Sequence, residues 1–230
     1  MSLTSLKTAL KKAATPQRAK VSQRFFKTGK GQYGEGDVFI GITVPEMRKI
    51  AHTFKSLSLP EIKQLLESPI HEERFIALEI LVYQFDHQKE RQKEIYQFYL
   101  KNTNRINNWD LVDTSAEYIV GAYLKDKDTS ILTKLANSSS IWERRIAIVS
   151  TFNFIKNNQF QETLKIATLL LKDNHDLIHK AVGWMLREIG KRDQNTLKTF
   201  LKQHHNTMPR TMLRYAIERF PKDEREQYMK

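Results

Sequence analysis

The sequence predicts an all-α protein in which pairs of helices repeat along the chain and stack into a superhelical solenoid with a concave face. Three observations support this fold class. Apolar residues recur at helical spacing through most of the 230 residues, as in Phe75, Leu78, Val82 and Phe85. No alternating pattern of convincing length indicates a strand. Similar helix segments also return at a nearly constant step, which is typical of helix-pair repeats.

Three prolines predict where the first helices begin. Pro16 follows Thr15, and proline suits the first helical turn because its φ is already helical and its missing N–H would have no partner there. Pro45 and Pro60 each stand between an apolar residue and a glutamate. We therefore expect helices to begin close to residues 16, 44 and 59.

A glycine-rich stretch lies between the first two of these starts. Five of the eight glycines fall within residues 29–41, and residues 29–34 read G-x-G-x-x-G. A dinucleotide-binding turn with this pattern needs a strand before it and a helix that opens at its third glycine, and neither is predicted. The preferred interpretation is a flexible loop, which can lie against a phosphate backbone through Lys27 and Lys30.

Five predicted helices can be laid over one another. Their equivalent reference positions, separated by steps of 35, 35, 36 and 33 residues, are Arg74, Trp109, Arg144, Lys180 and Leu213. The third residue after each is small or β-branched: Ala77, Val112, Ala147, Gly183 and Ala216. A small residue there lets adjacent helices approach closely. The Trp, Gly, Tyr and Ala signature of tetratricopeptide repeats is missing, so the repeats are better described as HEAT-like. No linker is obvious, so we expect one domain over residues 1–230.

The charge of the chain points to a polyanionic partner. A formal net charge of +12 favours nucleic acid, with an acidic membrane surface as the runner-up. A basic protein without a polyanionic partner is the ordinary alternative. The absence of cysteine excludes disulfides and thiolate chemistry. Neither a signal peptide nor an apolar run long enough to span a bilayer is evident, so we expect a soluble cytoplasmic protein, acting as a monomer and without membrane contact.

Two histidines four residues apart raise the question of a metal site. His175 and His179 would face the same way on a helix, as zinc ligands can. The zinc-protease motif needs a glutamate directly after the first histidine, where this sequence has Asp176, and no third ligand is evident. The preferred interpretation is a helix start with exposed histidines and no metal.

The segment around Trp109 has an unusual composition. Asn107 or Asn108 can cap a helix, and Asp110 then lies in its first turn, where the helix dipole favours a carboxylate. Asp113 lies four residues after Trp109, so both project from one helix face. Together they can hold a cation, the ring through its quadrupole and the carboxylate through its charge. Taken alone, however, the segment favours a core tryptophan beside an aspartate that pairs with an arginine.

The repeat register changes that preference. Trp184 occupies, in its own helix, the position that Asp113 occupies in the earlier one, and Arg187 follows three residues later. Arg145 comes one residue after the reference position of the intervening repeat. Because equivalent positions of a solenoid line one surface, these residues and Trp109 are expected to form one groove. A groove of aromatic rings, one carboxylate and guanidinium groups suits a polyanion that carries a local positive charge.

Several ordered motifs resemble the bacterial DNA alkylation repair family, the AlkD-like alkylpurine DNA glycosylases with HEAT-like repeats. They lie at residues 108–113, 141–147 and 179–188, with further similarity at 34–37 and 208–215. The resemblance covers most of the chain, from about residue 25 to residue 220. It implies that the concave face binds double-stranded DNA with alkylated bases.

The resemblance also implies roles for individual residues. Trp109 and Trp184 would press against the deoxyribose of the damaged nucleotide, and Asp113 would be the catalytic carboxylate. Arg145 and Arg187 would hold the DNA backbone around the lesion.

One position departs from part of the family. Some members carry a tyrosine in an N-terminal helix, where this sequence has Phe25, which is expected to contact DNA as well. The implied activity is hydrolysis of the N-glycosidic bond of cationic N3- or N7-alkylated purines without base flipping, which needs no metal and no other cofactor. Two alternatives stay open: a catalytically inactive DNA-structure-binding protein of the same fold, and a protein-binding helical scaffold.

Overall fold

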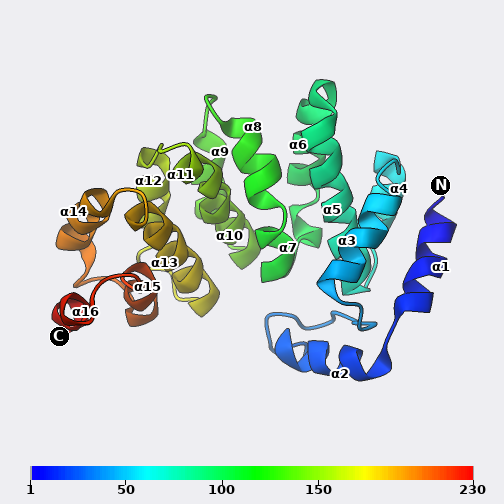
Figure 1. Ribbon diagram of the computed structural model, residues 1–230, viewed down its shortest axis with the longest axis horizontal. Coiled ribbons are helices and arrows are strands. Elements are labelled where there is room, and N and C mark those ends of the chain that lie inside the picture. The colour runs from blue at the N-terminus through cyan, green and yellow to red at the C-terminus, as the bar shows by residue number, and fades with distance from the viewer. Residues whose placement is uncertain (1, 230) are drawn as a thin grey trace. The chain divides into compact units, whose positions relative to one another are not determined.

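The computed structural model describes residues 2–229 and is helical almost throughout this range (Figure 1). Its β structure is confined to one isolated bridge between Val38 and Ile70. The predicted all-α class is therefore confirmed for the described residues. The chain divides into two compact units, one ending at Ser115 and the other beginning at Ala116.

The first unit contains two short 3₁₀ segments, Lys89–Arg91 and Thr103–Arg105, and the α-helices α1 (Leu3–Ala13), α2 (Pro16–Phe25), α3 (Val44–Thr53), α4 (Leu59–Leu66), α5 (His71–His87), α6 (Gln92–Lys101) and α7 (Trp109–Asp113). The three proline-marked starts are confirmed. At α3 and α4 a capping box closes the start, with Thr43 and Glu46 in the former and Ser58 and Glu61 in the latter.

The core of the first unit forms where α3 and α4 pack against α5. Met47, Ile62, Leu65, Leu78 and Leu81 are all buried there. Helix α2 is different, because it buries no residue and lies crosswise below α1 and α3 in Figure 1. The hydrophobic core therefore holds α5 firmly, while α2 presents most of its surface to solvent.

Helix α7 is short because the chain turns directly after it. A turn at Thr114 and Ser115 ends the helix, and a π-helical segment, Glu117–Gly121, begins the second unit. The Ser115 hydroxyl donates to the carbonyl of Leu111 at 2.6 Å, a back-bond that commonly bends helices. Apolar residues continue at helical spacing across this turn, so hydrophobic periodicity does not reveal the interruption.

The second unit continues with α8 (Ala122–Leu124), α9 (Ser130–Ala136), α10 (Ile141–Ser150), α11 (Phe152–Lys156), α12 (Gln161–Leu169), α13 (Asp176–Gly190), α14 (Gln194–His204), α15 (Arg210–Ala216) and α16 (Lys222–Met229). Helix α10 packs against α9 and α13, and α13 packs against α14 and α15. A Cβ added to Gly183 would lie 2.5 Å from the carbonyl oxygen of Met212, so this glycine permits the close approach of α13 and α15.

The sequence repeat corresponds to real helices. Its copies fall on α5, α7, α10, α13 and α15, and each predicted small or β-branched residue is buried. Stacking of the whole chain into one superhelix with a concave face, and its treatment as a single domain, stay predictions. Among the described residues, no helix has the length and apolar character needed to cross a membrane.

Candidate functional site

Helix α7 carries two of the predicted site residues. Trp109 is its first residue and Asp113 its last, and both are half-buried. Val112, Ala116 and Ile119, which follow one another at helical spacing, are fully buried. Trp109 and Asp113 therefore lie beside the core rather than inside it, one helical turn apart.

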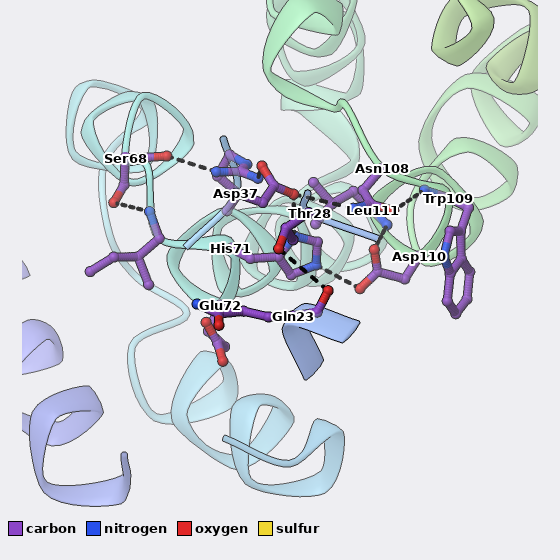
Figure 2. Close-up of polar contacts among 12 residues, drawn as sticks. Gln23, Thr28, Asp37, Ser68, His71, Glu72, Asn108, Trp109, Asp110 and Leu111 are labelled. Carbon is purple, nitrogen blue, oxygen red and sulfur yellow. Dashed lines mark hydrogen bonds and ion pairs between the residues drawn. The ribbon is translucent and has the colours of Figure 1, made fainter. Parts of the chain in front are cut away.

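A buried network of side chains holds the start of α7 (Figure 2). Asp37 accepts hydrogen bonds from His71 Nδ1 at 3.1 Å, from an Arg74 guanidinium nitrogen at 2.5 Å and from the Asn108 amide at 3.1 Å. The other imidazole nitrogen of His71 lies 2.8 Å from the Asp110 carboxylate. Asp37, His71, Arg74 and Asn108 are all less than 9% exposed, so these side chains bond one another rather than solvent.

Electrostatics favour a positively charged His71. Burial of the ring disfavours the imidazolium, but the Asp110 charge and the hydrogen bonds to Asp110 and Asp37 outweigh burial and raise the pKa of His71 to about 9. Burial also disfavours the charged form of Asp37 and so raises its pKa. The hydrogen bond from His71 and the charge of Arg74 outweigh this effect, so the pKa of Asp37 lies below its ordinary value. The two aspartates and the two cations balance one another.

An aromatic cluster covers this network on one side. The ring of Trp109 is stacked on Phe26 with 5.2 Å between centroids and 14° between planes. Phe26 stacks in turn on Phe39 at 4.8 Å, and Phe39 stacks on His71 at 4.4 Å. Phe25 meets the Trp109 ring edge-on at 5.8 Å and is 63% exposed. The predicted DNA contact Phe25 thus lies at the surface, directly beside Trp109.

A pocket of about 310 Å³ opens next to the cluster, within the first unit. Its walls are mainly apolar side chains of α2, α3 and the preceding loop, and it also reaches His71, Glu72 and Asp110. Glu72 accepts hydrogen bonds from the backbone amides of Ile40, Gly41 and Ile42. The pocket gives solvent access to the Asp110 end of the network.

The second unit carries the remaining predicted site residues. Trp184 is half-buried and meets Phe152 edge-on at 5.6 Å. Arg145 is only 6% exposed, and its guanidinium donates to the carbonyl of Leu177 at 2.6 Å. Arg187 forms an ion pair with Glu218. Both arginines therefore have protein partners in this structure, and their predicted contacts with a DNA backbone stay predictions.

The histidine pair has a local structural role. His175 caps α13, and its Nδ1 accepts from the amide of Leu177 at 3.2 Å. His179 contacts the carbonyl of Asp173 through Nε2 at 2.5 Å. The helix start is confirmed, but both histidines are half-buried rather than exposed. Among residues 2–229, no group of three or more His, Cys, Asp or Glu side chains is arranged to hold a metal ion.

The glycine-rich segment forms a series of turns after α2, with no strand before it. The amides of Gly29 and Gly31 are bonded to the side chains of Gln32 and Glu35. Gly34 is buried, and a Cβ there would lie 2.4 Å from the carbonyl oxygen of Phe26. The segment is thus bonded to itself and packed on the end of α2, which explains why it needs glycine without any nucleotide.

Sequence reasoning missed the network behind Trp109. It gave Asp110 a role at a helix start and treated the region of Arg74 only as a repeat position, so neither His71 nor Asp37 was expected near α7. His71 lies 34 residues from Asp37 and 39 from Asp110 in the chain. The available signals in the sequence were the Gly36-Asp37 pair within the glycine-rich stretch and His71 at the start of a repeat helix.

A family model and several solved structures match this chain. The model of the family described as DNA alkylation repair enzyme matches residues 6–220. A solved structure described as a predicted DNA alkylation repair enzyme from Enterococcus faecalis is 16% identical with a TM-score of 0.69, over 91% of this chain and 97% of that chain. AlkD2 from Streptococcus mutans is 18% identical with a TM-score of 0.58, over 90% of this chain and 98% of that chain. A search of the curated proteins finds no match.

Proposed function

Because the chain belongs to the DNA alkylation repair enzyme family, we propose that it is a DNA glycosylase that hydrolyses the N-glycosidic bond of cationic N3- or N7-alkylated purines in duplex DNA. The observation that carries the proposal is the pairing of Trp109 and Asp113 on α7, one turn apart and both partly open to solvent. An aromatic face next to a carboxylate suits a group that becomes cationic.

The chemistry of the substrate fits such a sparse site. An N7- or N3-alkylated purine already carries a positive charge, so it leaves as a neutral base and needs no general acid. Positive charge instead develops on the deoxyribose as the bond to C1′ breaks. A fixed carboxylate stabilises charge that exists mainly in the transition state, which lowers the barrier rather than only tightening substrate binding.

We assign these roles to residues of the chain. The Asp113 carboxylate stabilises the sugar cation and orients a water for attack on C1′, and the faces of Trp109 and Trp184 contact the deoxyribose. Arg145, Arg187 and Phe25 contact the DNA around the lesion, and the base leaves without being drawn into a protein pocket. The net charge of +12 supports a polyanionic substrate.

Substitution of Asp113 by asparagine tests the assignment. Asp113→Asn keeps the size of the side chain but removes its charge, so single-turnover excision of 7-methylguanine should slow by about a hundredfold or more. Affinity for the same duplex should hardly change and the melting temperature should stay close to that of the parent. Asp86→Asn removes an exposed carboxylate, 71% exposed at the end of α5, and is the matched control.

The alternative roles of Asp113 predict other patterns. If its carboxylate only holds two parts of the fold together, the melting temperature, DNA affinity and excision rate should fall in parallel. A stable, DNA-binding Asp113→Asn protein that excises at the parent rate would remove Asp113 from the mechanism.

A further inference from the structure

We infer that His71, bridging Asp37 and Asp110, is a positioning residue that fixes the direction of α7 and thereby aims Trp109 and Asp113 at the damaged nucleotide. The inference rests on the proposed function for its excision readout. The immobilisation of Trp109 by the bridge does not depend on that function, because it concerns the protein without DNA.

The residues on both sides of Trp109 are tied to the bridge. Asn108 donates to Asp37 at 3.1 Å and accepts from the Trp109 amide at 2.8 Å. On the other side, Asp110 binds His71 at 2.8 Å and accepts from the Leu111 amide at 2.9 Å. The backbone of Trp109 is therefore held between two side chains that meet at the same buried histidine and aspartate.

The indole ring is held by the same elements. Trp109 stacks on Phe26, and the Phe26 ring lies 5.0 Å from the His71 ring. Backbone and ring of Trp109 are thus both fixed relative to α5, which the core of the first unit holds in place. Figure 2 shows Trp109 beside Asp110, and a dashed line joins Asp110 to His71 on the other side.

Helix α7 needs such an anchor because it cannot fix its own direction. Five residues form barely more than one helical turn, which is unstable without tertiary contacts. The turn at Thr114 and Ser115 follows at once, so no longer helix carries it. A small rotation of α7 would move Trp109 and Asp113 together, and a displacement of about 1 Å at a reacting centre can cost a hundredfold in rate.

The bridge needs a protonated histidine to be complete. Only imidazolium donates from both ring nitrogens, to Asp37 and to Asp110 at once. The charged groups that face His71 are Asp37 from the glycine-rich segment, Asp110 from α7 and Arg74 from α5, while Arg18 and Glu72 line the adjoining pocket. Because the folded-state pKa of about 9 exceeds the ordinary 6.5, the bridge is complete at low pH and is lost as the pH rises through about 9.

Two variants test the bridge through the pH profile of single-turnover excision. Parent protein should lose activity as the pH rises through about 9. Asp110→Asn removes the charge that does most to keep His71 protonated, so the pH at which excision is lost should fall. At pH about 6, where His71 is again protonated, the variant should regain activity. His71→Gln cannot form the double bridge, so it should be slower than the parent by about a hundredfold below pH about 9 and should lack the alkaline loss at His71.

Matched controls lie on the same helix as His71. His87→Gln and Asp86→Asn make the same chemical changes at exposed positions at the end of α5, and both should keep the parent rate and profile. If His71→Gln does not fold, the pH dependence of excision by Asp110→Asn tests the inference by itself. An unshifted alkaline limit in Asp110→Asn, or a folded His71→Gln protein with the parent rate, would overturn the inference.

A spectroscopic arm needs no enzymatic activity. In a Trp142→Phe, Trp184→Phe background, Trp109 is the single tryptophan, and its quenching by acrylamide reports how firmly its ring is held. Quenching should increase above pH about 9, and at lower pH in the Asp110→Asn derivative. Quenching that follows neither the pH nor the substitution contradicts the inference even if the protein excises no base. Failure of excision together with the expected quenching counts against the proposed function alone.

Discussion

At the scale of single residues, the first unit places carboxylates where backbone or side-chain donors surround them. Glu72 is 2% exposed, and its carboxylate accepts from the amides of Ile40, Gly41 and Ile42. These bonds fix the loop that forms one wall of the pocket beside Asp110. A carboxylate suits this place because it accepts from several donors and offers none.

Replacing Glu72 by glutamine should destabilise the protein. Glu72→Gln replaces the charged acceptor of three amides with a neutral one and places an N–H₂ group where the second carboxylate oxygen lies 3.1 Å from the Ile40 amide nitrogen, at a cost of roughly 1–3 kcal/mol in the free energy of unfolding. Denaturant unfolding measures this loss. Glu67→Gln, at a side chain that is 55% exposed, is the control and should be nearly neutral. Equal stabilities for the two variants would contradict the role given to Glu72.

The sequence predicts single residues well where the pattern is local and poorly where partners are distant. A helix cap at Asn107 or Asn108, which the structure places at Asn108, and Trp109 and Asp113 on one helix face follow from local spacing. The link from His71 to Asp37 and Asp110 depends on the tertiary approach of three segments, which no local pattern encodes. The partners of Arg145 were missed for the same reason, since Leu177 lies 32 residues further along the chain.

At the scale of elements, helix starts and close helix contacts were predictable because each has a local physical cause. Prolines mark the beginnings of α2, α3 and α4, and small residues mark where repeat helices approach. The break after α7 and the π-helical segment Glu117–Gly121 were not predicted. At the break the Ser115 hydroxyl donates to the carbonyl of Leu111, and the apolar periodicity continues through this stretch without marking it.

Gly183 offers a test of close helix packing. In Gly183→Ala the new Cβ would meet Met212 and Tyr215 at 2.5 Å, so α13 and α15 must separate. Overpacking of this kind costs about 1–3 kcal/mol in the free energy of unfolding. Alanine favours a helix over glycine by roughly 1 kcal/mol, so a cost near the upper end of the overpacking range leaves the variant less stable. Thermal unfolding should show a lower melting temperature than for the parent.

The matched control for Gly183→Ala is Gly29→Ala, where the added Cβ would meet only the flexible side chain of Gln32. Its melting temperature should stay close to that of the parent. A Gly183→Ala protein as stable as this control would show that α13 and α15 do not need a glycine at their contact.

At the scale of the whole molecule, the net charge of +12 supports a polyanionic substrate, and the Trp109–Asp113 pair supports the proposed chemistry. The sequence predicted the all-α class and the repeat, and the family match over residues 6–220 agrees with the resemblance of its motifs. The continuity of the superhelix across the two compact units stays a prediction, because a sequence repeat defines equivalent helices without defining how a turn such as that at Thr114 and Ser115 joins them.

We propose that the protein excises bases that are already cationic, because its proposed site stabilises the sugar and supplies no acid for the leaving group. The most direct measurement is release of free base from two otherwise identical duplexes, one with 7-methylguanine and one with the neutral lesion hypoxanthine. We predict release of 7-methylguanine well above the protein-free rate and no detectable release of hypoxanthine. Tight binding of both duplexes without release of either base, or equal release from both, would contradict the account.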